Sequence, residues 1–283
     1  MRQHKTEWLS DNQLKDDGAI GLAMNTSWVR LKKLELFRNN IGTIGTKALG
    51  SNSAWDNLEE LGLHQNIMGD DGAIFTAESS TWKNVKIIWL NLNNISDEGA
   101  AAVGRNTTWA NLVELRMSNN HITDKGAAII GSNTSWPNLK ILSLRQNQVS
   151  DEGCAAIARN ATWTNLEELY LQMNEITDIG AREIGQSPIW TKLTKLDLSM
   201  NKIGTKGAIE LSRNNIWRDL KELSLTSNRI GYKGGLFLGM NSNWTKLERQ
   251  LLSGSEGMKT EEENALKGSV LFGSKIKIEE GEQ

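Results

Sequence analysis

The chain has 283 residues, with 32 basic and 34 acidic side chains and a formal net charge of −2 at pH 7. A charge this evenly balanced excludes a global positive field that would attract nucleic acid or an anionic membrane. The single cysteine, Cys154, excludes an internal disulfide, and the first ten residues, MRQHKTEWLS, lack the apolar stretch of a secretory signal. No apolar run approaches the roughly 18 residues that span a bilayer. These features predict a soluble, cytoplasmic protein that binds neither membrane nor nucleic acid.

Tryptophan recurs every 27 residues along most of the chain. The recurring tryptophans are Trp28, Trp55, Trp82, Trp109, Trp136, Trp163, Trp190, Trp217 and Trp244. A fixed period of this length indicates an array of similar units, each of which buries its apolar face against its neighbours. We number positions within a unit from its tryptophan, so that +5 is the fifth residue after it.

The chain begins in the middle of a unit. Residues 1–27 keep the second half of the pattern, but His4 and Glu7 stand where the other units carry apolar residues. One interpretation is a truncated first repeat, left when a longer array is cut and its first edge is exposed. The other is an N-terminal cap improvised from Trp8 and Leu9.

Residues 28–243 contain eight full units, and the first half of each predicts a β-strand. Apolar residues occupy +3, +6 and +8, as at Leu31, Leu34 and Leu36, and the last two alternate as in a strand with one buried face. Position +11 is asparagine in all eight units. We expect this asparagine to turn inward at the end of the strand and to satisfy backbone groups of the adjoining loops.

The second half of each unit predicts a short helix. Position +17 is glycine in every full unit, and the segment 96–106, SDEGAAAVGRN, offers Ser or Asp as N-cap, acidic residues in the first turn and a run of alanine. Cys154, at +18, is expected to be a small buried residue of this helical layer. The recurring tryptophans are expected to stack along one edge, with each indole N–H bound to a loop carbonyl.

The last unit departs from the pattern. Residues 244–278 keep the tryptophan but place Gln250 at +6 and Ser255 at +11. They are predicted to form a degenerate ninth repeat and a polar C-terminal cap, with a helix over residues 260–267. Residues 279–283 are predicted to be a solvated tail.

The order Leu-x-x-Leu-x-Leu-x-x-Asn-x-Ile, which extends over roughly residues 9–255, resembles the leucine-rich-repeat family. The helix in each unit makes the chain most similar to the ribonuclease-inhibitor-like class of that family. The resemblance implies an α/β solenoid, a horseshoe with a parallel concave β-sheet and short convex helices. It also implies a non-enzymatic, monomeric scaffold that binds a protein partner of unknown identity. The alternative is a sensor or substrate-recognition segment of a larger multidomain receptor or ligase adaptor.

No catalytic, cofactor or metal site is predicted. His4, His64 and His121 are far apart in the sequence and are expected to be ordinary surface residues. The glycines recur once per unit and form no phosphate-binding loop. Because no histidine is in register with Cys154, nucleophilic catalysis by its thiol is not expected.

The resemblance places the side chains at +5, +7 and +9 on the concave face, with +4 and +10 at its margins. Ten basic and nine acidic residues occupy these columns, and their signs mostly alternate at +4 and +5, which predicts ion pairs that hold neighbouring strands in register. Aromatic, methionine and arginine side chains, which are enriched in interface hot spots, interrupt the polar residues at +7, +9 and +10. The predicted protein-binding residues are Phe37, Trp89, Leu92, Arg116, Arg145, Tyr170, Met173 and Met200, with Trp89 and Tyr170 as anchors.

Overall fold

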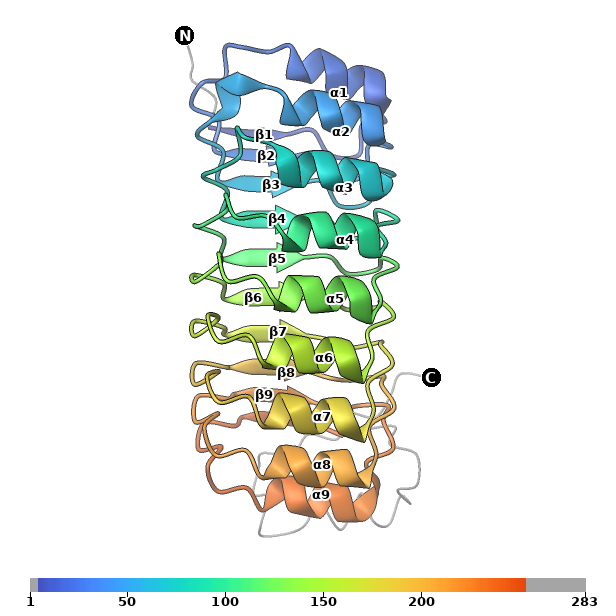
Figure 1. Ribbon diagram of the computed structural model, residues 1–283, viewed down its shortest axis with the longest axis vertical. Helices are drawn as coiled ribbons and strands as arrows, with labels where there is room; N and C mark the ends of the chain where they lie inside the picture. The colour runs from blue at the N-terminus through green and yellow to red at the C-terminus, as the bar shows by residue number, and fades with distance from the viewer. Residues whose placement is uncertain (1–4, 253–283) are drawn as a thin grey trace.

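The computed structural model describes residues 5–252, and within this range the chain is a single stack of strand and helix units (Figure 1). Among these described residues, ten strands form one parallel sheet whose order is the order of the sequence. The helices lie side by side in a second layer that covers one face of this sheet (Figure 1). The predicted α/β solenoid with a parallel sheet is therefore confirmed. The predicted helix over residues 260–267, the rest of the C-terminal cap and the tail over 279–283 lie outside the described residues.

The strands are short, and each covers only positions +5 to +7 of its unit. They are β1 Thr6–Trp8, β2 Lys33–Glu35, β3 Glu60–Gly62, β4 Ile87–Trp89, β5 Glu114–Arg116, β6 Ile141–Ser143, β7 Glu168–Tyr170, β8 Lys195–Asp197, β9 Glu222–Ser224 and β10 Arg249–Leu251. The helices are α1 Lys15–Ala23, α2 Thr43–Gly50, α3 Gly69–Glu78, α4 Asp97–Gly104, α5 Asp124–Gly131, α6 Asp151–Ala158, α7 Asp178–Gly185, α8 Thr205–Ser212 and α9 Gly231–Gly239. None of these helices is long and apolar enough to cross a membrane.

The recurring tryptophans form a stacked ladder inside the core. Trp136 and Trp163 are fully buried, and their rings lie 6.4 Å apart at an interplanar angle of 8°. The predicted stacking is confirmed, but the predicted hydrogen bond is wrong, because Nε1 of both indoles is buried without a hydrogen-bond partner. The rings belong to the continuous apolar core, where van der Waals packing of the ring determines their position.

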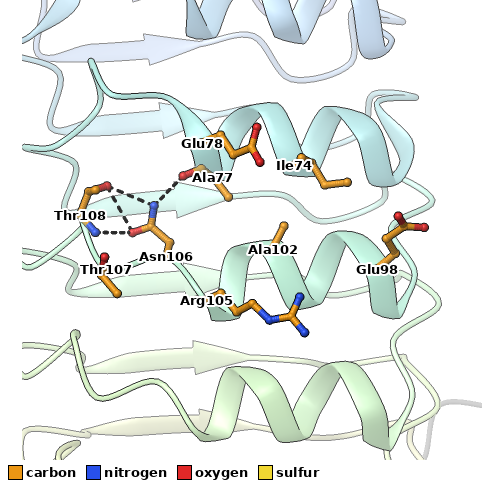
Figure 2. Close-up of a pocket in the computed structure, with 9 residues that line it drawn as sticks. All are labelled: Ile74, Ala77, Glu78, Glu98, Ala102, Arg105, Asn106, Thr107 and Thr108. Atoms are coloured by element: carbon orange, nitrogen blue, oxygen red, sulfur yellow. Dashed lines mark hydrogen bonds between the residues drawn. The ribbon is translucent and has the colours of Figure 1, made fainter.

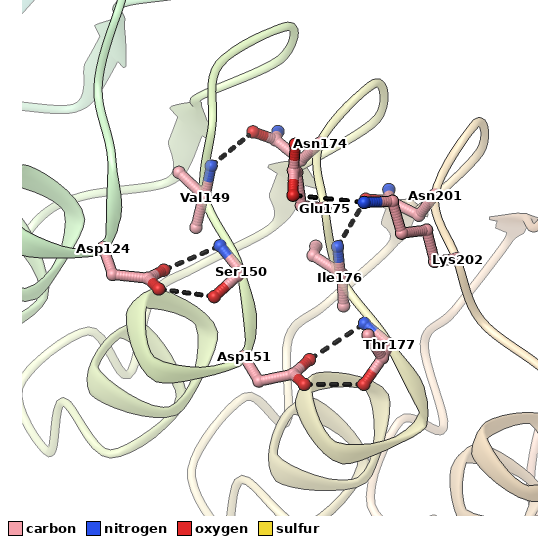
Figure 3. A network of polar contacts seen from close by, with 10 residues as sticks. All are labelled: Asp124, Val149, Ser150, Asp151, Asn174, Glu175, Ile176, Thr177, Asn201 and Lys202. Carbon is pink, nitrogen blue, oxygen red and sulfur yellow. Dashed lines mark hydrogen bonds and ion pairs between the residues drawn. The ribbon is translucent and has the colours of Figure 1, made fainter.

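The asparagines at +11 form the second ladder, and the prediction for them is confirmed. Asn147 Oδ1 accepts a hydrogen bond from the backbone N–H of Ile122 at 3.0 Å. Its Nδ2 group donates to the carbonyls of Met117 and Leu144, each at 3.0 Å. Figure 3 shows the same acceptor role for Asn174 and Asn201 in the following repeats. Each asparagine thus joins its own loop to the preceding repeat.

A third ladder of aspartates at +15 was not predicted. Asp97, in the first turn of α4, accepts hydrogen bonds from Thr123 N at 2.8 Å, Thr123 Oγ1 at 2.6 Å and Gly126 N at 3.0 Å. These donors begin the next helix, α5, so the carboxylate of one helix caps the N-terminus of its successor. Ser96 caps α4 itself, by accepting from Glu98 N at 3.5 Å.

The aspartate ladder explains the glycine at +17. A Cβ atom on Gly126 would lie 2.8 Å from Asp97 Oδ1, so any larger residue would push the carboxylate off the helix end. Figure 3 shows the same clamp in two later repeats, where Asp124 holds Ser150 and Asp151 holds Thr177.

Where the aspartate is missing, the local backbone changes with it. Thr43 occupies +15 in its unit, and its Oγ1 donates to the carbonyl of Met68 at 3.0 Å, where an aspartate would accept from an N–H. The following helix then begins at Gly69, whose φ of +61° lies in the left-handed region that favours glycine. Thr205 and Gly231 repeat the arrangement at α9, with a φ of +63°. In both cases, a hydrogen-bond donor at +15 of one unit accompanies a glycine with a positive φ at the start of the helix in the next unit.

We expect Asp97→Ala to lower the free energy of unfolding by about 1–2 kcal/mol, the usual cost of losing a helix N-cap. Urea unfolding followed by circular dichroism measures the change. Glu98→Ala is the matched control, because Glu98 is an exposed acidic residue in the same turn. Equal stability of the two variants would contradict the capping role of Asp97.

The effect of Asp97→Ala is expected to depend on pH. Burial alone would raise the pKa of the Asp97 carboxyl, but the hydrogen bonds from Thr123 and Gly126 and the charge of Lys125 hold that pKa below its ordinary value of 3.8. A lowered pKa in the folded state stabilises the fold above the unfolded-state pKa, and this stabilisation is lost as the pH falls through the folded-state pKa. The stability difference between wild type and Asp97→Ala should therefore be complete at neutral pH and shrink below about pH 4.

Candidate functional site on the sheet face

The side chains at +5, +7 and +9 lie on the face of the sheet opposite the helices, and we call this surface the sheet face. Successive side chains of a strand point to opposite faces of the sheet, so those at +5 and +7 share this surface while Leu34 at +6 is fully buried. The predicted charge pairs between neighbouring strands are present: Lys33 Nζ lies 2.7 Å from Glu60 Oε2, and Lys195 Nζ lies 2.8 Å from Glu222 Oε1. Exposed pairs of this kind contribute about 0.2–1 kcal/mol each, enough to favour one register.

An aromatic cluster covers the N-terminal part of the sheet face. The rings of Phe37 and His64 stack with centroids 4.7 Å apart, and His64 meets Trp89 edge-on at 5.8 Å. The expectation that His64 is an ordinary surface residue is therefore wrong, because the two aromatic neighbours half-bury it, and this burial lowers the pKa of its imidazole. His121 is exposed as expected, and His4 lies outside the described residues.

Trp8 extends the aromatic surface and was not among the predicted binding residues. It pairs with Glu35 across β1 and β2 and lies 66% exposed, whereas Leu9 packs against the core. Lys33 Nζ lies 4.8 Å from the ring centroid of Trp8 and 5.3 Å from that of Trp89, so one ammonium contacts both rings. The sequence signal was present, because Trp8 precedes Glu35 by 27 residues and so occupies a +7 position.

Beneath this ammonium lies a buried carboxyl group. Glu35 is 2% exposed, and burial raises the pKa of its carboxyl although Lys33 Nζ lies 3.3 Å from Oε1. Gly62, the neighbour of Glu35 on β3, provides the space, since a Cβ atom there would overlap the carboxyl group. Lys33 thus offsets part of the charge of Glu35, whereas Glu35 Oε2 is buried without a hydrogen-bond partner.

Tyr170 occupies the middle of the sheet face. Its ring lies between two cations, with the Arg116 guanidinium carbon 5.6 Å and Lys195 Nζ 5.3 Å from the ring centroid. The hydroxyl donates to Glu168 Oε2 at 2.6 Å, and burial together with this carboxylate raises the pKa of the phenol. The ring is therefore held in one orientation while part of its surface remains accessible.

Trp89 is held in a similar way. Its Nε1 group donates to Glu114 Oε1 at 2.7 Å, and the same oxygen accepts from Arg116 Nε at 2.5 Å. Both predicted anchors are therefore half-buried aromatic rings whose polar ends are tied to a glutamate at +5. They lie three strands apart in the sheet, so they do not contact one another.

A shallow hollow of about 340 Å³ lies between the two anchors, and we call it the arginine hollow. It brings together four of the eight predicted residues, Leu92, Arg116, Arg145 and Tyr170. The other lining residues are His64, Asn91, Ser118, Asn119, Ser143 and Gln172. Polar groups and guanidinium groups thus share one concavity, which suits binding and offers no paired acid and base for catalysis.

The remaining predicted residues lie around the arginine hollow. Phe37 belongs to the aromatic cluster, and Met173 Sδ lies 3.8 Å from Arg145 Nη2. Met200 is 50% exposed at the margin. Leu92, Met173 and Met200 all occupy +10 and have φ values of 56°, 58° and 53°, so the backbone turns sharply there. The sequence did not predict this left-handed conformation, because leucine and methionine rarely adopt it.

A larger hollow of about 500 Å³ lies between α3 and α4 (Figure 2). It accompanies an irregularity in the asparagines at +24, where two units carry a serine instead, Ser79 and Ser187. Asn133 Nδ2 donates to two carbonyls of the preceding unit, at +22 and +24, but Asn106 donates to that of Ala77 alone. Because the polar atoms of Asn106 are already bonded within the loop, this hollow presents no prepared ligand group, and we place the candidate site on the sheet face.

Cys154 is fully buried, as predicted, and burial, with the nearby charges of Asp151 and Asp124, raises the pKa of its thiol well above the ordinary value. A protonated, inaccessible thiol is not a nucleophile. Within residues 5–252 no three His, Cys, Asp or Glu side chains gather as they would around a metal ion.

Comparison with known proteins gave one family and one fold. A family model described as "Leucine Rich repeat" matches more than half of the chain, at residues 9–23, 31–50, 83–104, 110–130, 137–158, 164–185, 191–212 and 218–239. No curated protein matches the chain. A solved structure, the functional domain of InlJ from Listeria monocytogenes, which includes a cysteine ladder, is similar with a TM-score of 0.53 and 15% sequence identity. The match covers 89% of this chain and 49% of that one, so this chain spans about half the length of that structure. At this identity the likeness concerns the fold alone.

Proposed function

The chain belongs to the leucine-rich repeat family, and from this premise we propose that it is a non-enzymatic scaffold that binds a protein partner on the sheet face. Repeats of this kind are generally used for protein–protein recognition. The observation that carries the proposal is the pair of anchors, because Trp89 and Tyr170 are half-buried rings fixed by hydrogen bonds of 2.7 Å and 2.6 Å to glutamates. Side chains ordered before binding lose less conformational entropy when the partner arrives.

The residues around the two anchors also support a protein-binding function. Aromatic rings and arginines are the side chains that most often carry binding energy in protein interfaces, and here they surround the arginine hollow. The three ladders fix the strands that present them, so the surface is preorganised over several repeats. Such a rigid, mixed surface is suited to recognition of a folded or extended protein segment.

Three further assignments belong to this proposal. We place the chain in the ribonuclease-inhibitor-like class, because an α-helix returns the chain in every full repeat. We place it in the cytoplasm as a monomer, since its one cysteine is a buried free thiol and no disulfide stabilises the described repeats. The role of recognition segment in a larger receptor or ligase adaptor would use the same surface, and it stays the alternative.

The double substitution Trp89→Ala with Tyr170→Ala tests the proposal. Loss of two hot-spot rings, each worth about 2 kcal/mol or more, should weaken partner binding at least 100-fold. Proteins retained from lysate by the wild-type chain are quantified on the double variant, and the affinity of each is then measured with purified protein.

The matched control replaces two apolar side chains on the helices, Ile44→Ala with Ile179→Ala, which are 64% and 54% exposed. This variant should bind as the wild type does, and thermal unfolding verifies that both variants are folded. If every partner binds the Trp89 and Tyr170 variant with unchanged affinity, the proposed binding face is wrong.

A further inference from the structure

We propose that the arginine hollow receives the carboxylate of an aspartate or glutamate from an extended segment of the partner. The proposal rests on the proposed function and adds the chemistry of the bound segment. Its basis is the uneven distribution of charge on the sheet face, which the overall balance of ten basic and nine acidic residues conceals.

The acidic and basic residues occupy different columns. In the eight full repeats, every carboxylate of the sheet face and its margins lies at +4, +5 or +7, and none lies at +9 or +10. The full charges at +9 and +10 are the guanidinium groups of Arg38 and Arg145. The strip formed by +9 and +10, where the chain leaves the strands, therefore carries the positive charge of these two arginines and no negative charge.

Of these two arginines, only Arg145 is left for a ligand. Arg38 Nη1 lies 3.5 Å from Asp11 Oδ2, which offsets its charge. Arg145 is exposed, its Nη2 contacts Met173 Sδ at 3.8 Å, and no carboxylate of residues 5–252 lies within ion-pair distance of it. An arginine fork of this kind matches a carboxylate with two parallel hydrogen bonds.

Arg116 supplies a second group of donors in the same hollow. Its Nε group is bound to Glu114, but its two terminal nitrogens make no hydrogen bond to any side chain or backbone group that the structure describes. Ser118 and Ser143 lie beside it, with their hydroxyl oxygens 2.7 Å apart. The hollow thus presents two guanidinium groups and neutral polar groups, and the latter suit the N–H and C=O groups of a peptide backbone.

A single carboxylate suits this arrangement better than a polyanion. Glu114 and Glu168 line the adjacent +5 column, and a continuous chain of phosphates laid across the strands would meet their charges. One acidic side chain that enters between Arg116 and Arg145 avoids them. This charge pattern favours a peptide over a nucleic acid.

Two exposed apolar residues suggest the spacing of the segment. Leu92 is 42% exposed and Met200 is 50% exposed, and each lies two strands from Arg145, on opposite sides. Two strand spacings are about 10 Å, which an extended peptide covers in about three residues. The segment is therefore expected to carry an acidic residue with apolar residues about three positions before and after it.

Selection from a library of random 12-residue peptides displayed on phage tests the proposal, with the whole chain immobilised. The wild type should enrich peptides that share one Asp or Glu with the apolar spacing above. Arg145→Glu should instead enrich Lys or Arg at that position. Lys83→Glu is the matched control, because Lys83 is an exposed lysine in a loop away from the arginine hollow, and it should select the same peptides as the wild type.

The affinity of one enriched peptide then gives the pairwise test. Replacing its acidic residue by Gln or Asn should weaken binding to the wild type at least tenfold and leave binding to Arg145→Gln almost unchanged. Enriched peptides without a shared acidic residue, or peptides that bind Arg145→Glu as well as wild type, would overturn the proposal, as would a wild-type selection that enriches nothing.

The Trp89→Ala with Tyr170→Ala variant separates this proposal from the proposed function. If the enriched peptides carry no acidic residue and do not bind that variant, the proposed binding face is supported and the carboxylate site is refuted. Acidic peptides that depend on Arg145 but bind the double variant unchanged would support the carboxylate site and refute the two anchors.

Discussion

Changing Trp163 to alanine is expected to lower the free energy of unfolding by about 3–5 kcal/mol, the usual cost of removing a buried tryptophan. Trp163 is fully buried, and its ring lies 6.4 Å from that of Trp136. Its removal would leave a cavity between two repeats that each rely on the other for burial. Urea unfolding followed by tryptophan fluorescence and circular dichroism measures the loss.

The unpartnered indole N–H makes a second, sharper comparison possible. Because Trp163 Nε1 is buried without a hydrogen-bond partner, Trp163→Phe removes no hydrogen bond and should cost less than half as much as Trp163→Ala. Trp8→Ala is the matched control for an exposed ring, since Trp8 is 66% exposed, and its effect should stay within about 1 kcal/mol. Equal losses for Trp163→Phe and Trp163→Ala would contradict the role of ring packing in holding Trp163 in the core.

Asn147→Ala is also expected to lower the free energy of unfolding, by about 1–3 kcal/mol, because it leaves one buried backbone N–H without a partner. This group is the N–H of Ile122, which donates to Asn147 Oδ1 at 3.0 Å. The carbonyls of Met117 and Leu144, which also accept from Asn147, keep hydrogen bonds from Asn120 and Asn174. The same unfolding measurement detects the change. Gln148→Ala controls for the neighbouring exposed amide, and a loss for Asn147→Ala no greater than for that control would contradict the ladder.

The sequence predicted the fold well because one period determines both the unit and its neighbour. Leu34 and Leu61 occupy the same position in adjacent units, so a stack with a 27-residue register pairs them, as observed. Apolar alternation acts within a single unit. The +11 asparagine also bonds to the preceding unit, but it was predicted because the same residue recurs in all eight full units. The aspartate ladder was missed because Asp97 bonds to residues 26 and 29 positions away, in the next unit. Within its own unit Asp97 resembles any first-turn acid.

The candidate site was predicted in outline only. Reading the columns found Trp89 and Tyr170, since aromatic residues are unusual at +7. His64 and Trp8 were missed because each has a contact that crosses columns. His64 stacks on Phe37 in its own +9 column, but it also meets Trp89 at +7 of the next unit. The path of the Lys33 side chain, which leaves its own column to contact Trp8 and Trp89, depends on rotamers that no sequence pattern specifies.

The central claim is that a partner occupies the sheet face, and hydroxyl-radical footprinting of the complex with a retained partner tests it most directly. Trp89 and Tyr170 on the sheet face and Met200 at its margin should lose reactivity when the partner binds. Phe237 and Met240, which are 40% and 59% exposed at helix α9, should react as they do in the free chain. Protection of the helix residues with unchanged reactivity of Trp89 and Tyr170 would contradict the account.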